Sequence, residues 1–207
     1  MRKAKQKKRG QRTRNRKKII CIGTEGRNKT ERTYFSHFNQ MNTEYVVHFA
    51  KGNDTDPYKI ATAVSASIGR PKDREKGDRA FCVFDTDVDP KKQKNIQDAR
   101  SYCKEQKIEV IYSNPCFEIW YLLHYTYSTR AFNKNEEILS ALAKYIQNYQ
   151  KNQDYFESLL PKMKTAIKNA KRLEQYHAEN HHLTEMTRNP STQIYKIVEL
   201  FVSDQPN

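Results

Sequence analysis

Two sets of acidic residues, each placed after an apolar run, have the types and spacing best suited to chemistry. Glu25 and Glu31 follow the run KIICIG, and Asp85, Asp87 and Asp89 close the run AFCVFDTDVD. Carboxylates at the end of a buried strand are unfavourable unless a cation neutralises them, and ligand sets of oxygen atoms favour Mg²⁺ or Mn²⁺ over zinc. The sequence therefore predicts a divalent-metal site with the ligands Glu25, Asp85, Asp87 and Asp89.

Each set also has a purely structural interpretation. Asp85 and Asp87 alternate along an extended chain, so both side chains project to one side, where their proximity raises one pKa unless a metal neutralises them. Glu31 can instead be an acid in the first turn of a helix, where the helix dipole favours it. Asp89 can instead cap the helix that begins at Pro90.

A further acid, Glu118, lies in the apolar block SNPCFEIWYLLHY. An unpaired carboxylate is unfavourable in such surroundings, so we predict that Glu118 joins Glu25 and Glu31 as a catalytic residue. The alternative is again an acid in the first turn of a helix. His124, in the same block, is expected to be a packed histidine and not a ligand.

The elements that must position these acids alternate between strand-like and helix-like segments in the first half of the chain. The expected strands are 18–23, 44–49, 79–85 and 107–113. The expected helices are 30–41, 57–69 and 90–105. This alternation is typical of a parallel sheet flanked by helices, in which the carboxyl ends of the strands share one edge. We therefore expect an α/β fold with a parallel sheet of about four strands.

After Pro115 the pattern is helical only, with a polar gap at 177–190 that we expect to be a loop. The expected helices are 135–149, 154–176 and 191–203. Because FEIWYLLHY is too apolar to stand alone, this half should pack on the sheet. The expected organisation is a disordered basic tail (1–18), an α/β core (19–114) and a C-terminal helical region (115–207).

Positive charge is concentrated at the N-terminus. Residues 1–18 contain 11 Lys or Arg and no acid, so the net charge of +14 leaves +3 for residues 19–207. Such a segment cannot bury apolar surface and is attracted to phosphates, although it can equally be a solvated arm. It lacks the apolar core of a secretory signal, and no apolar run is long enough for a membrane span. We therefore expect a cytoplasmic protein without a membrane partner.

Further basic residues extend the predicted contact with nucleic acid. The helix expected at 154–176 carries Lys and Arg spaced three or four apart, which predicts a basic stripe, although most charged stripes are solvated faces. The predicted nucleic-acid-binding residues are Lys17, Lys18, Arg27, Lys29, Lys164, Lys168, Lys171 and Arg172.

Two other kinds of site have less support. The stretch GTEGRNKT nearly matches a phosphate-binding loop, with Asn28 in place of the last glycine, so an NTPase is an alternative. Glu25 would, however, direct negative charge toward the phosphates. The four cysteines include no CxxC pair and are expected to be buried reduced thiols, not zinc ligands or disulfides.

Four blocks in order resemble the RloB-like family: IICIGTEGRNKTERTYF, FCVFDTDVD, SNPCFEIWYLLHY and NPSTQIYKIVEL. The succession of strand, Glu, Gly, helix and a later strand ending in Asp-x-Asp is similar to the Toprim fold of topoisomerases, primases and OLD-family nucleases. The resemblance implies that Glu25 is the strand-end glutamate and that Asp85 and Asp87 are the metal-binding pair. It also implies that Glu31 is the second acid of the nuclease branch.

The resemblance further implies a phage-defence protein of the abortive-infection type, controlled by an AAA- or ABC-type ATPase partner. Together with the acids and the basic segments, it leads us to expect an Mg²⁺- or Mn²⁺-dependent nuclease in which Glu25 is a ligand or general base. The alternative is a non-catalytic nucleic-acid-binding or regulatory subunit, in which the acids only help the site to fold. The sequence leaves open DNA against RNA, including tRNA, and assembly into a homo-oligomer.

Overall fold

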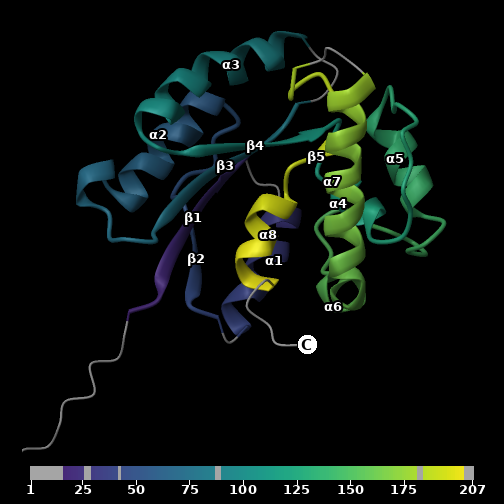
Figure 1. Ribbon diagram of the computed structural model, residues 1–207, viewed down its shortest axis with the longest axis horizontal. Coiled ribbons are helices and arrows are strands. Elements are labelled where there is room, and N and C mark those ends of the chain that lie inside the picture. The colour runs from purple at the N-terminus through teal and green to yellow at the C-terminus, as the bar shows by residue number, and fades with distance from the viewer. Residues whose placement is uncertain (1–15, 26–28, 42, 87–89, 181–183, 203–207) are drawn as a thin grey trace, which may run out of the picture.

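The computed structural model describes residues 16–25, 29–41, 43–86, 90–180 and 184–202. Its centre is a five-stranded sheet with the order β2-β1-β3-β4-β5 (Figure 1). The strands are β1 (Lys18–Thr24), β2 (Tyr45–Phe49), β3 (Arg79–Asp85), β4 (Glu109–Asn114) and β5 (Ser191–Thr192). β1 to β4 are parallel, and β5 runs antiparallel to β4. The predicted α/β class and parallel sheet are confirmed.

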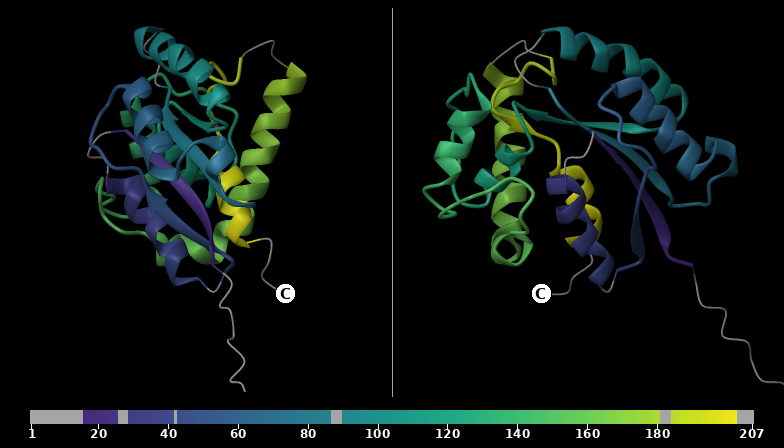
Figure 2. Two further views of the ribbon diagram at one scale, coloured as in Figure 1. Left: turned by 90° about the vertical axis from the view of Figure 1, so that its left-hand side faces the viewer. Right: turned by 180° about the vertical axis from the view of Figure 1, so that it is seen from behind.

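Helices cover both faces of the sheet. α2 (Pro57–Ile68) and α3 (Pro90–Glu105) lie on one face, and α1 (Lys29–Ser36) and α8 (Tyr195–Val202) lie on the other (Figures 1 and 2). Asp56 caps the start of α2, because its side chain accepts a hydrogen bond from the Lys59 amide at 2.9 Å.

Side chains of the central strands alternate between two hydrophobic cores. Ile20 and Ile22 of β1 pack into the core under α1 and α8, whereas Cys21 faces the core under α2 and α3. Phe81 and Cys82 divide in the same way in β3. Strands covered on both faces read as continuous apolar runs, and this explains why β1 and β3 carry the chain's strongest strand signals.

The C-terminal helices join the core under α1 and α8, as expected for a region that packs on the sheet. They are α4 (Glu118–Leu123), α5 (Asn135–Leu142), α6 (Phe156–Leu159) and α7 (Met163–Asn180). Among the described residues, short 3₁₀ helices span His37–Gln40, Pro71–Asp73 and Leu160–Lys162. No helix in the described residues combines the length and apolar character needed to cross a membrane.

Three predicted boundaries in the C-terminal half are wrong. The segment 191–203 begins with strand β5 and not with a helix. A strand of two residues is too short to show a periodicity in the sequence, so it was not predicted. The helix predicted at 135–149 ends at Leu142, and a loop follows. The helix predicted to stop at residue 176 continues to Asn180, into the predicted polar loop.

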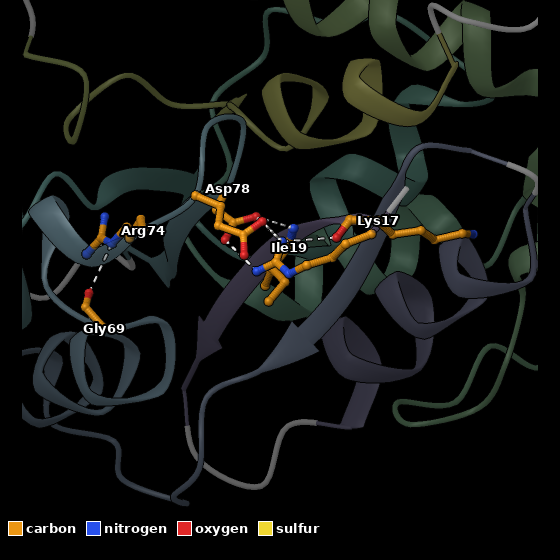
Figure 3. Close-up of polar contacts among 7 residues, drawn as sticks. Lys17, Ile19, Gly69, Arg74 and Asp78 are labelled. Atoms are coloured by element: carbon orange, nitrogen blue, oxygen red, sulfur yellow. Dashed lines mark hydrogen bonds and ion pairs between the residues drawn. The ribbon is translucent and has the colours of Figure 1, made fainter. Parts of the chain in front are cut away.

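Asp78, in the turn before β3, ties the start of the described chain to the sheet (Figure 3). The Ile19 amide donates to Asp78 Oδ1 at 2.8 Å, and Arg16 Nη2 donates to Oδ2 at 2.9 Å. The hydrogen bond from Arg16 has the largest effect on the Asp78 carboxyl, and together with that from Ile19 it holds the pKa of this group below its usual value. Arg16, near the end of the predicted basic tail, is therefore held beside β1.

Gly23 of β1 lies directly against α2. A Cβ atom at this position would lie 2.4 Å from Val64 Cγ2 and 2.8 Å from Ile60 Cγ2. We expect Gly23→Ala to lower the free energy of unfolding by about 1–3 kcal/mol, because overpacking forces neighbours to shift. Urea denaturation of Gly23→Ala in the wild-type and Val64→Ala backgrounds measures this cost. The cost should shrink when Val64 is shortened, and equal costs in both backgrounds would contradict the packing argument.

Candidate active site

The carboxyl ends of β1 and β3 bring Glu25 and Asp85 together. The two strands are parallel neighbours, with Thr24 opposite Val83, so Glu25 emerges beside the last residue of β3. The Asp85 amide donates a hydrogen bond to Glu25 Oε1 at 3.2 Å across a separation of 60 residues. The sheet therefore places these two predicted ligands at one point.

Glu31, in the first turn of α1, is a buried carboxylic acid. Its side chain is 4% exposed, and Oε2 has no hydrogen-bond partner in the described part of the chain. Burial, reinforced by the negative charges of Glu118 and Glu25, raises the pKa of Glu31 to about 8. Glu31 therefore keeps its proton at neutral pH and is electrostatically linked to both other predicted catalytic acids.

Glu118, at the start of α4, is 3% exposed but has polar partners. Tyr149 Oη donates to Glu118 Oε1 at 3.3 Å, and Lys151 Nζ lies 3.6 Å from the same oxygen. Burial alone would lower the pKa of Lys151, but the attraction of Glu118 and Asp85 outweighs it and raises that pKa. The ammonium group of Lys151 is thus held charged beside the buried acids.

The loop between α5 and α6 delivers Tyr149 and Lys151, both of which the sequence interpretation missed. Asn148 and Asn152 have φ angles of 55° and 68°, a left-handed conformation that asparagine tolerates. The Asn152 amide donates to Thr30 Oγ1 at 3.1 Å, which fastens the loop to the start of α1. The polar run NYQKNQD, with asparagine at both turns, was the available signal for a loop.

Cys116 adds to the buried surroundings of Glu118, and His124 is packed further along the same segment. Burial first, and then the charges of Glu118 and Asp85, raise the pKa of Cys116 well above its usual value. Cys116 and the other three cysteines are free and buried, as predicted. His124 is 1% exposed and shares a 2.9 Å hydrogen bond with the Trp120 carbonyl, which confirms a packed histidine.

Comparison with protein-family models gives a match over residues 20–201, described as RloB-like protein. The chain belongs to the RloB-like family. The matched range contains all the acids described above, so the family resemblance and the site concern the same part of the molecule. Comparisons with curated proteins and with solved structures gave no match.

The described acids of this RloB-like chain fit a divalent cation in their chemistry. Glu25 and Asp85 supply oxygen donors, which Mg²⁺ and Mn²⁺ prefer. In the described residues, however, no three His, Cys, Asp or Glu side chains are arranged so that they could hold a metal ion. A full ligand set would need the predicted ligands Asp87 or Asp89, which lie outside the described residues.

The predicted basic residues of the RloB-like chain are dispersed. Lys17 and Lys18 lie at the amino end of β1, opposite to the end that carries Glu25, and Lys18 pairs with Glu44 at 2.7 Å. The structure therefore does not bring these two lysines to the acids. Arg27 lies outside the described residues, as does the side chain of Lys29.

The four remaining basic candidates lie on α7, where Lys164 and Lys168 are exposed. Lys171 pairs with Glu199 at 2.6 Å, which offsets its charge. The Arg172 guanidinium lies 4.0 Å from the centre of the Tyr127 ring. α7 thus carries basic residues together with an aromatic contact, and their role in nucleic-acid binding stays a prediction.

The burial of Glu31 predicts a pH-dependent stability in metal-free buffer. The pKa of Glu31 is about 8 in the folded protein against an ordinary value of 4.5, so between these pH values only the unfolded state releases the proton. The contribution of Glu31 to the free energy of unfolding should therefore decrease by up to about 1.4 kcal/mol per pH unit as the pH rises from 5 to 8. Glu31→Gln removes the titration and should become the more stable protein over this range.

Urea unfolding of both proteins at several pH values, with a chelator present, measures the difference. Glu157→Gln, at an exposed position of α6, controls for the loss of an acid. Parallel stability curves for wild type and Glu31→Gln would show that Glu31 does not hold its proton.

Proposed function

We propose that this RloB-like chain is a divalent-metal-dependent nuclease of Toprim type. The hydrogen bond from the Asp85 amide to the Glu25 carboxylate carries the proposal, because it brings the strand-end acids of two parallel neighbours to one point, where both could serve one metal. A buried acid and a charged lysine beside this pair add support. Mg²⁺ or Mn²⁺ is the expected cofactor.

The surroundings of each side chain suggest its role in hydrolysis. Glu25 and Asp85, with Asp87, would hold the metal. When bound, the metal would neutralise the scissile phosphate and make a water more acidic. Glu31, buried beside these acids, could exchange a proton with a group that enters the site. Lys151 offers positive charge to a phosphate close to Glu118.

The biological setting is proposed on the family resemblance. We propose that the chain acts in abortive-infection defence against phages and that an AAA- or ABC-type ATPase partner controls it. A nuclease harmful to its own cell needs such restraint. The substrate is a nucleic acid, and DNA, RNA and tRNA all present the phosphodiester that the site would cut.

A non-catalytic nucleic-acid-binding or regulatory subunit is the second candidate. The observation that favours it is that Glu118 already has Tyr149 and Lys151 as partners, as an acid with a structural role would. In that case the ion pair of Lys151 with Glu118 would serve only to stabilise the fold.

The nuclease proposal predicts that Asp85→Asn abolishes metal-dependent cleavage. The activity should fall by about 100-fold or more, because loss of a ligand costs at least as much as loss of an outer-shell partner. Plasmid, single-stranded DNA and tRNA are incubated with Mg²⁺ or Mn²⁺, with and without the ATPase partner. Asp98→Asn, an exposed position on α3, should cut like the wild type.

Equal cleavage by Asp85→Asn and the wild type would reject the catalytic assignment. If the wild type binds these nucleic acids but cuts none of them, even with the partner present, the binding-subunit candidate is supported instead.

A further inference from the structure

A small pocket lies beside the acids, at the carboxyl ends of β1 and β2. It is lined by Gly23, Thr24, Arg32, Ala50, Lys51, Gly52, Asp54, Lys59, Ile60 and Ala63. Thr24 is the last residue of β1 and directly precedes Glu25, so the pocket and the proposed metal ligands share one strand end. None of the lining residues is used by the proposed catalytic chemistry.

The charge of this pocket suits an anion. Arg32, Lys51 and Lys59 contribute three positive charges against the one negative charge of Asp54. Lys59 Nζ lies 3.5 Å from Asp54 Oδ1, but both side chains are at least half exposed, so this pair is weak. The pocket is therefore cationic, although the acids lie at the same edge of the sheet.

The Arg32 guanidinium is held in a defined position within the lining. Nη2 donates to the Ala50 carbonyl at 3.1 Å, and the group lies 5.2 Å from the centre of the Phe49 ring. Arginine has five N–H donors in a planar fork that matches phosphate geometry. A guanidinium fixed in this way is preorganised to bind a phosphate oxygen.

The size of the pocket limits what can enter it. Its volume, about 20 Å³, exceeds the roughly 10–15 Å³ that a single water requires. A phosphate oxygen, which is about the size of a water, can therefore enter the pocket. Gly52, with a φ angle of 126°, forms part of the wall, and a residue with a side chain would be strained there.

We propose that this pocket binds one phosphate group of a nucleic-acid strand and thereby aligns the strand beside Glu25 and Asp85. The inference rests on the proposed function for its substrate class. Contacts to phosphate position a strand without reading its sequence, so the pocket would set where along the backbone the strand lies. Arg32, Lys51 and Lys59 are the residues that would contact the phosphate.

The test measures binding without cleavage. Fluorescence anisotropy, with a chelator present, gives the affinity for a labelled single-stranded oligonucleotide, as DNA and as RNA. The strand is kept short enough to bind in one register and is then prepared with one neutral methylphosphonate at each position in turn. For the wild type, neutralising one particular phosphate should weaken binding by about tenfold, the value expected for a charge-assisted hydrogen bond, and neutralising any other should have a smaller effect.

The double variant Lys51→Gln, Lys59→Gln should bind the unmodified strand about tenfold more weakly and lose the dependence on that one phosphate. Both lysines are exposed, so the variant should fold, which circular dichroism checks. Lys134→Gln, Lys144→Gln removes two exposed lysines elsewhere and serves as the charge-matched control. Arg32→Gln should reproduce the loss if it also unfolds like the wild type.

Equal weakening by the lysine variant and its control, or a wild type for which no single phosphate stands out, would overturn the proposal. If inorganic phosphate binds the wild type but not the lysine variant, while no strand position stands out, the pocket serves a free phosphate and the strand assignment is wrong. Because no metal is present, a protein that never cuts can still pass this test. Failure here and failure of the nuclease proposal are therefore distinguishable.

Discussion

The concentration of carboxylates at one edge of the sheet, in surroundings that exclude most water, is the constraint on which the site depends. Like charges cannot all remain ionised in such a place. The pKa of Glu31 is raised to about 8, which favours its protonated form. Glu118 instead accepts a hydrogen bond from Tyr149 and lies beside the ammonium group of Lys151. The left-handed residues Asn148 and Asn152 therefore shape the loop that brings Tyr149 and Lys151 to Glu118.

The same edge depends on the parallel pairing of β1 with β3. The register places Thr24 opposite Val83, and Glu25 then meets the backbone of Asp85. A strand shifted by one residue would turn Ile20 and Ile22 toward the wrong core and would separate the two acids. Burial on both faces of the sheet thus fixes the register, and the register places Glu25 beside Asp85. The contact between Gly23 and α2 belongs to this arrangement, because it lets the helix lie close to the strand end.

Much of this arrangement could be predicted from the sequence. The apolar runs before Glu25 and Asp85 are strong strand signals because both faces are covered, and their carboxyl ends meet as a parallel sheet requires. The sequence did not reveal Lys151, whose role depends on a loop fastened to Thr30 by a tertiary hydrogen bond. It also did not reveal β5, which owes its place to pairing with Ser113 and Asn114 and not to its own two residues. The sequence also did not reveal the pocket around Arg32, because its residues come from β1, α1, α2 and the loop that follows β2.

Direct measurement of Mn²⁺ binding by electron paramagnetic resonance tests the central claim, that the acids at the strand ends form a cation site. The wild type should bind Mn²⁺ specifically, and Glu25→Gln with Asp85→Asn should abolish that binding while the folded state is retained. Asp98→Asn should bind like the wild type. Absence of Mn²⁺ binding to the wild type, or equal binding by the Glu25→Gln, Asp85→Asn protein, would contradict the account.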